Sequence, residues 1–256
     1  MDKNNTAAVE AMRGERFSLP ALRIADGTLE ALKWIGLLLM TGDHVNKYLL
    51  NDTVPLLFDA GRAVMPIFVF VLAFNLARPG TLARGVYPRT MARLAVFGVL
   101  ATPAFIALGG LLAGWWPLNI LFTLLVLTAT LFFLERGFLK HGSKANFVAA
   151  CVIGLLGGSS VEFWWPAILM GVAVWFYAKR PTATALVVVV LACATLAVIN
   201  RNFWALAALP AIAAASRIDV RCPRWKWAFY AYYPVHLTAL WLIRIPMSHA
   251  GYLFFT

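Results

Sequence analysis

The sequence predicts an all-α, polytopic integral membrane protein, a helical bundle of about nine transmembrane helices with a cytoplasmic N-terminus. Three observations predict it. The chain is 62% hydrophobic and 13% charged, more apolar and less charged than soluble domains. Its apolar residues gather in runs of spanning length. Its basic residues gather in alternate connections between those runs, which is the pattern of a multi-pass protein.

Nine apolar runs follow one another after residue 28. A spanning helix needs about 20 mostly apolar residues, and the expected helices cover residues 29–50, 60–77, 93–113, 118–134, 146–158, 162–178, 183–199, 202–216 and 225–243. The fifth and eighth runs are short. If one of them does not cross the membrane, the orientation of the later half inverts.

The distribution of cations predicts the orientation. Most of the 22 Lys and Arg residues fall in residues 1–28 and in every second connection, as expected of cytoplasmic segments. The net charge of +11 therefore reflects membrane orientation rather than binding of nucleic acid. Residues 1–28 lack the apolar core of a signal peptide. We expect them to form a polar cytoplasmic arm, followed by one transmembrane domain over residues 29–256.

The first expected helix carries polar residues inside its apolar run, LLLMTGDHVNKYLL at residues 37–50. The apolar segment 31–42 would rise only about 18 Å, too short for a hydrocarbon core of about 30 Å. The helix must therefore continue through Asp43 and His44, whose side chains need protein partners or a water-filled cavity. Histidine accepts protons near neutral pH, and a carboxylate stabilises its charge. We interpret His44 as a general base that Asp43 tunes or orients.

Other polar residues are expected at a similar depth. Arg62 opens the second helix, Asn119 opens the fourth and Glu162 opens the sixth, while Tyr233 and His236 lie in the last. We expect these five to line a substrate pocket. Structural interpretations stay open: Arg62 as a snorkelling side chain, Glu162 as an exposed helix start, and His236 as a packing histidine. No serine nucleophile elbow, phosphate loop or metal-ligand spacing occurs, so no metal site is predicted.

Three separated segments carry a family resemblance. They are LKWIGLLLMTGDHVNKYL, AGRAVMPIFVFVLAFNLAR and FYAYYPVHL, in that order, and with them the chain after residue 29 resembles the TraX family. The resemblance implies a protein of the bacterial inner (cytoplasmic) membrane that serves N-terminal acetylation of conjugative pilin. It therefore implies acetyl-CoA as co-substrate and a pilin, or another envelope molecule, as acceptor.

The TraX family is similar to the larger class of membrane acyltransferases that acetylate sugars. In that class a basic residue and a later histidine of the first helix are functionally important, and Lys33 and His44 stand at the matching positions. Lys replaces the usual Arg, which loses bidentate recognition of a phosphate. Four arginines at the expected cytoplasmic mouth are further candidates to hold acetyl-CoA, although topology alone also explains them. They are Arg78, Arg84, Arg89 and Arg93.

The sequence thus favours an acetyl-CoA-dependent N-acetyltransferase that acts on the terminal amine of a pilin. Its expected partners are acetyl-CoA, the acceptor and the lipid bilayer, without nucleic acid. Three alternatives remain open: acetylation of a glycan or lipid hydroxyl, a proton-coupled transporter, and a non-catalytic assembly factor. Intramembrane Asp and His also serve proton relays, but the internal repeat typical of many transporters is not evident.

Overall fold

A computed structural model describes residues 19–139 and 142–254, and within these ranges the chain is helical and forms no strand. Of the expected polar arm, residues 1–18 lie outside the described residues. The helices are α2 (Asp26–Leu49), α3 (Pro55–Gly61), α4 (Val64–Leu76), α5 (Val86–Ala107), α6 (Ile120–Gly137), α7 (Lys144–Val152), α8 (Trp164–Lys179), α9 (Ala183–Ala194), α10 (Ala197–Asn200), α11 (Ala208–Ala215) and α12 (Ala228–His249), with the π-helical turn η1 (Ile153–Gly157) and the 3-10 turn η2 (Trp204–Ala207).

Each of the nine predicted apolar runs is helical in the structure, although four of them are built from two helical pieces. These composite runs are α3 with α4, α7 with η1, α9 with α10, and η2 with α11. The third run differs at both ends. α5 already begins at Val86, since the polar segment before the apolar run, which carries Arg89, is also helical. It ends at Ala107, before Gly109 adopts a positive φ of 79°.

Four helical stretches among the described residues are long and apolar enough to cross a membrane. They are Pro55–Leu76, Val86–Ala107, Ile120–Gly137 and Ala183–Asn200. Two shorter apolar helices, Lys144–Gly157 and Trp204–Ala215, accompany them. α8 has 16 residues, and α2 is a continuous helix whose apolar sequence is interrupted by Asp43 and Lys47. The bundle exposes many large apolar side chains on its flanks, as expected of a surface that faces lipid.

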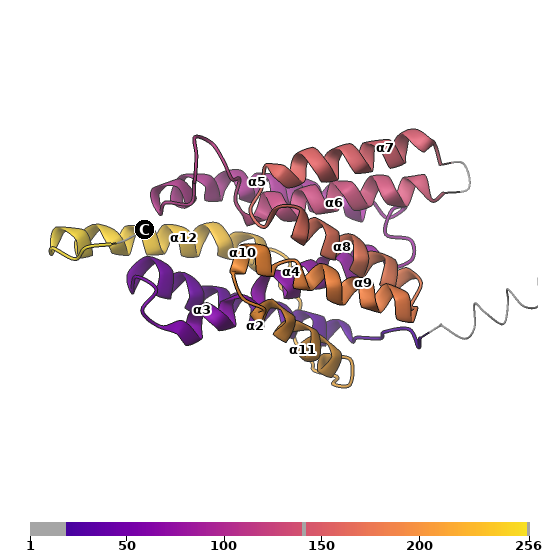
Figure 1. The fold of residues 1–256 in the computed structure, drawn as a ribbon, viewed down its shortest axis with the longest axis horizontal. Helices are drawn as coiled ribbons and strands as arrows, with labels where there is room; N and C mark the ends of the chain where they lie inside the picture. The colour runs from indigo at the N-terminus through magenta and orange to yellow at the C-terminus, as the bar shows by residue number, and fades with distance from the viewer. Residues whose placement is uncertain (1–18, 140–141, 255–256) are drawn as a thin grey trace, which may run out of the picture.

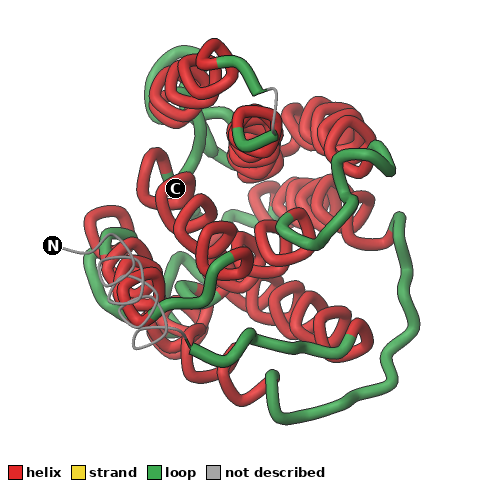
Figure 2. Tube along the Cα trace, turned by 90° about the vertical axis from the view of Figure 1, so that its right-hand side faces the viewer, coloured by secondary structure: helices red, strands yellow, loops and turns green. Residues whose placement is uncertain are grey.

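The helices run along one common axis, so the connections gather at two ends (Figure 1). We call one the basic end; it contains residues 19–25, 78–85, 180–182 and 217–227, and Figure 2 views the molecule from this side. Three contacts tie these segments together: Leu19 N to Pro181 O at 2.9 Å, Arg78 to Asp26 at 2.6 Å, and Thr28 Oγ1 to Ile218 O at 2.7 Å.

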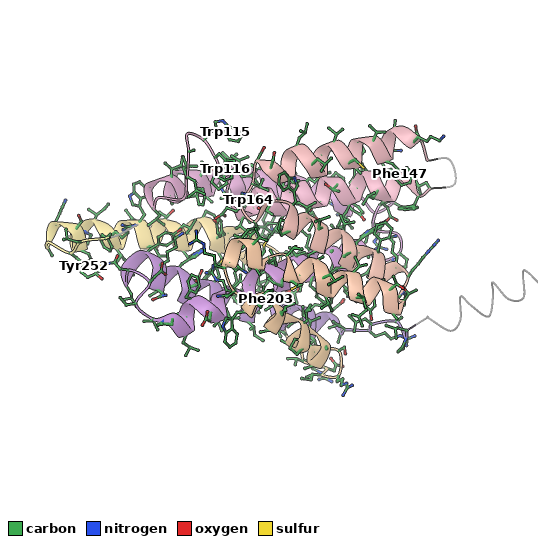
Figure 3. All side chains as sticks on the ribbon, viewed as in Figure 1. Trp115, Trp116, Phe147, Trp164, Phe203 and Tyr252 are labelled. Carbon is green, nitrogen blue, oxygen red and sulfur yellow. The ribbon has the colours of Figure 1, made fainter. Side chains whose placement is uncertain are left out.

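The opposite end contains residues 50–54, 108–119 and 159–163, and it is rich in aromatic side chains (Figure 3). The rings of Trp116 and Trp164 stack with their centroids 5.5 Å apart. Trp116 Nε1 donates to the Ser159 carbonyl at 2.7 Å, and the Leu118 amide donates to Ser160 at 2.9 Å. Tryptophan is enriched where a membrane meets water, so this end has the character of an interface.

α4 lies in the centre of the bundle, where it packs against α2, α6, α8 and α11. Most of its side chains are buried. α12 packs along both α5 and α2. The polar residues of α2 therefore face two neighbours, the α3–α4 pair on one side and α12 on another.

We expect Gly27→Ala to destabilise the protein by about 1–3 kcal/mol, the usual cost of overpacking. A Cβ at Gly27 would lie 2.0 Å from the Val220 carbonyl oxygen and 2.9 Å from the Cys222 amide nitrogen. Gly154→Ala is the control, because its Cβ would meet its nearest neighbour at 3.6 Å. Thermal unfolding of the purified protein in detergent measures both. Equal midpoints for the two variants would contradict this packing of α2 on the 217–227 segment.

Candidate functional site

The described part of the chain encloses a cavity toward each end of the bundle. The basic-end cavity has a volume of about 360 Å³ and includes Lys33, Arg78, Arg84 and Arg224 in its lining. The polar cavity has a volume of about 410 Å³ and contains the polar residues of α2. Three residues line both: Met40, Ile120 and Tyr233. The two cavities therefore adjoin in the middle of the bundle.

The polar cavity brings together five residues that the sequence singled out and two that it did not. The expected residues are Asp43, His44, Arg62, Glu162 and Tyr233, and the additional ones are Lys47 and Asp52. Lys47 follows His44 by three positions, a spacing that places both on one face of α2. From the sequence, this spacing was the indication that Lys47 belongs to the same site as His44. The pocket residues expected from five separate helices thus meet in one place, with two exceptions described below.

Asp43 pairs with Arg62. Arg62 Nη2 lies 2.5 Å from Asp43 Oδ1, and the two side chains are only 16% and 14% exposed. Gly61 allows this approach, since a Cβ there would lie 2.6 Å from Asp43 Cγ. Arg62 also donates from Nε to the Phe58 carbonyl at 3.1 Å and lies over the Phe58 ring. Arg62 therefore faces the protein and its charge is neutralised there, as a cation at membrane depth requires.

His44 pairs with His236 of α12. His44 Nδ1 lies 2.7 Å from His236 Nε2, and the two rings lie edge to edge, with centroids 5.0 Å apart and an interplanar angle of 12°. His236 Nδ1 in turn lies 2.9 Å from the Tyr232 carbonyl oxygen. His44 is thus hydrogen-bonded to His236, whereas Asp43, which was expected to tune or orient His44, is bound to Arg62. Adjacent residues on a helix point about 100° apart, so Asp43 faces α3 and α4 while His44 faces α12.

Tyr233 and Glu162 complete the polar cavity. The Tyr233 ring stands edge-on to His44 at 6.5 Å and to His236 at 5.5 Å. The Glu162 carboxylate faces the backbone N–H of Ile120, in the first turn of α6. The backbone of Glu162 is fixed as well, because its carbonyl accepts from Thr123 Oγ1 at 2.6 Å and its amide donates to Leu118 at 2.9 Å. A carboxylate at a helix N-terminus is stabilised by the helix dipole.

Asn119 and His236 were expected to line the pocket but line neither cavity. Asn119 is a structural cap: its Oδ1 accepts from the Leu121 amide at 3.1 Å. Its Nδ2 donates to the Gly98 carbonyl at 2.9 Å and to Thr102 at 3.3 Å, which joins α6 to α5. These bonds use both the oxygen and the nitrogen of the Asn119 side chain within the protein. His236 is 8% exposed and lies behind His44.

The basic-end cavity contains some of the cations expected there and excludes others. Lys33 is bound by Glu30 at 2.7 Å and lies 4.1 Å from the Phe229 ring, and Arg78 is bound by Asp26. Arg84 lines the cavity, as does Arg224, which is 3.8 Å from Glu30. Arg224 lies in one of the connections rich in Lys and Arg, which from the sequence indicated only the orientation of the chain. Nothing in the sequence just before the last helix indicated that Arg224 would line a cavity.

Arg89 and Arg93 do not line the basic-end cavity. Arg89 donates to the backbone carbonyls of Arg84 and Gly85 and so closes the turn before α5. Arg93 lies over the Trp227 ring at 4.8 Å. Their contacts are those of structural cations.

We expect Asp43→Asn and Arg62→Gln to destabilise the protein by about 3 kcal/mol each, the lower end for breaking a buried ion pair. Each substitution leaves the other charge unpaired inside the bundle. The double variant should lose clearly less than the sum, because the two residues act as one unit. Thermal unfolding in detergent of the wild type, both single variants and the double variant gives the coupling. Strictly additive losses would show that the two charges are independent.

Comparison with known protein families matches residues 28–244 to the family described as TraX protein. The match includes the charged side chains of both cavities and the His44–His236 pair. Neither the curated proteins nor the solved structures provide a match to the chain. The family match spans most of the sequence and accompanies four helices of membrane-spanning length and composition. The chain is therefore a membrane protein of the TraX family.

Proposed function

We propose that this protein is an acetyltransferase that moves an acetyl group from acetyl-CoA to the N-terminal amine of a pilin subunit. The observation that carries the proposal is the pair of adjoining cavities, one lined by cations and the other containing His44 beside carboxylates. The first suits an anionic phosphate-bearing donor, and the second suits an amine. The family resemblance supplies pilin as the acceptor class.

The proposed orientation has nine crossings of the bacterial inner membrane and a cytoplasmic N-terminus. The basic end supports it, because connections rich in Lys and Arg remain in the cytoplasm. In this orientation the basic-end cavity faces the compartment that contains acetyl-CoA. The polar cavity faces outward, where an envelope acceptor is presented.

The donor contacts that we propose are made chiefly by Arg84 and Arg224. Lys33 and Arg78 line the same cavity, but Glu30 and Asp26 already neutralise much of their charge. Guanidinium groups bind phosphate oxygens through paired hydrogen bonds, which suits the phosphates of coenzyme A. With the phosphates at this end, the thioester would extend toward Tyr233, where the two cavities adjoin.

The acceptor chemistry that we propose takes place in the polar cavity. A terminal amine has a pKa near 8, so much of it arrives as an ammonium ion that Glu162 can hold. His44 removes one proton, and the neutral nitrogen attacks the thioester carbonyl. The C–S bond then breaks as the amide forms. The proton held by His44 passes to the coenzyme A thiolate, and the second proton of the attacking nitrogen passes to the Glu162 carboxylate. Tyr233, which lines both cavities, would donate a hydrogen bond to the oxyanion of the tetrahedral intermediate.

We expect His44→Ala to lower acetyl transfer by about 10²–10⁴-fold, the usual contribution of a general base, with the protein still inserted. Mass spectrometry of co-expressed pilin measures this: the wild type adds one acetyl group at the N-terminus and the variant does not. An unchanged pilin alongside a newly acetylated glycan or lipid would move the acceptor to a hydroxyl. Absence of any acetylated product with the wild type would favour a transporter or an assembly factor.

We expect Arg84→Gln and Arg224→Gln each to raise the KM for acetyl-CoA by about tenfold or more, because a hydrogen bond to a charged group contributes about 1.5–3 kcal/mol. Arg136→Gln is the control, since Arg136 is an exposed cation on α6 outside both cavities. Steady-state kinetics with purified protein and an acceptor peptide measures all three. A larger effect from Arg136 than from Arg84 or Arg224 would remove the donor assignment.

A further inference from the structure

We propose that His236 is a positioning residue that fixes His44 in one tautomer, with the proton on Nδ1 and the free lone pair on Nε2. For its catalytic meaning this inference rests on the proposed function, in which His44 is the base. In this arrangement Nε2 is the nitrogen of His44 that takes the proton. His236, a buried histidine outside both cavities, orients the His44 ring.

Two hydrogen bonds link His44 to His236 and His236 to the Tyr232 carbonyl. Their direction follows from the carbonyl, which is the last acceptor in this series. A backbone carbonyl only accepts, so His236 Nδ1, 2.9 Å from the Tyr232 oxygen, carries a proton. In a neutral imidazole the other nitrogen then holds a lone pair. That nitrogen, His236 Nε2, lies 2.7 Å from His44 Nδ1. His44 Nδ1 therefore donates, and the lone pair of His44 is left on Nε2.

The same contacts keep the His236 ring from turning. Its neighbours are the rings of His44 and Tyr232, whose centroids lie 5.0 Å and 5.1 Å from its own, with interplanar angles of 12° and 20°. The Tyr232 hydroxyl is bound in turn to Thr41 Oγ1 at 2.5 Å, which joins α12 to α2 one turn before His44. An acceptor held in this way imposes one tautomer on its donor.

The positions of the two histidines separate their roles. His44 lines the polar cavity, and among the described residues its Nε2 has no hydrogen-bond partner in the protein. His236 lines neither cavity, so it does not contact a substrate there. When His44 takes a proton on Nε2, its Nδ1–H still donates to His236. That bond becomes charge-assisted and stronger, which stabilises the protonated base.

The tautomer can be read directly by ¹⁵N NMR of histidine-labelled protein in lipid bilayers, without substrate. The chain has four histidines, and the His44→Ala and His236→Ala variants assign the two signals. We expect wild-type His44 to be protonated on Nδ1 and unprotonated on Nε2. His236→Ala should leave a mixture of tautomers, whereas His236→Gln should retain the wild-type state because its side-chain carbonyl can accept from Nδ1. Wild-type His44 protonated on Nε2 would overturn the proposal.

Kinetics tests the catalytic consequence. We expect His236→Ala to lower kcat by about 10²-fold while the KM for acetyl-CoA stays unchanged, and His236→Gln to recover most of the loss. The control is Thr238→Val, which removes only the bond from Thr238 Oγ1 to the Pro234 carbonyl one turn along α12. A change confined to KM would overturn the positioning role. An inactive wild type with the expected spectra would refute the proposed acetyl transfer and leave the tautomer assignment standing.

Discussion

A polar side chain at membrane depth must find its partner inside the protein, because lipid offers none. Two polar residues, Asp43 and His44, stand side by side on α2, and each contacts a different neighbour. Asp43 is bound by Arg62, between α3 and α4, while His44 is bound by His236 of α12. These contacts hold three parts of the bundle around one point. The polar cavity lies at that point, so the pairing that satisfies these two side chains also shapes the cavity around them.

The sequence predicts the helices well because hydropathy alone locates apolar runs, and all nine runs are helical. It also places Asp43 and His44 within the first helix. It could not tell which residue binds which, because that depends on how helices far apart in the sequence pack together. For the same reason Asn119 was expected in a pocket and is a helix cap, whereas Arg224 lines a cavity but was taken only as a topology signal. Charge identifies candidate residues, but the fold decides which of them meet.

Under the proposed function, the two cavities would let one small bundle join reactants from different compartments. The cations lie at one end and the histidine pair toward the other, with Met40, Ile120 and Tyr233 between them. A thioester held at that junction would be shielded from bulk water, which limits its hydrolysis. An acceptor arriving in the polar cavity would meet a base whose lone pair is already fixed. In this account neither reactant crosses the membrane, and the acetyl group alone passes between the cavities.

Proteoliposomes test that claim most directly. The purified protein is reconstituted, and labelled acetyl-CoA is sealed in the lumen while an acceptor peptide with a free N-terminus is added outside. Proteins inserted with the basic end toward the lumen should then acetylate the external peptide, and the label should appear on its terminal amine. Transfer that occurs only when acetyl-CoA and peptide are on the same side would contradict the account.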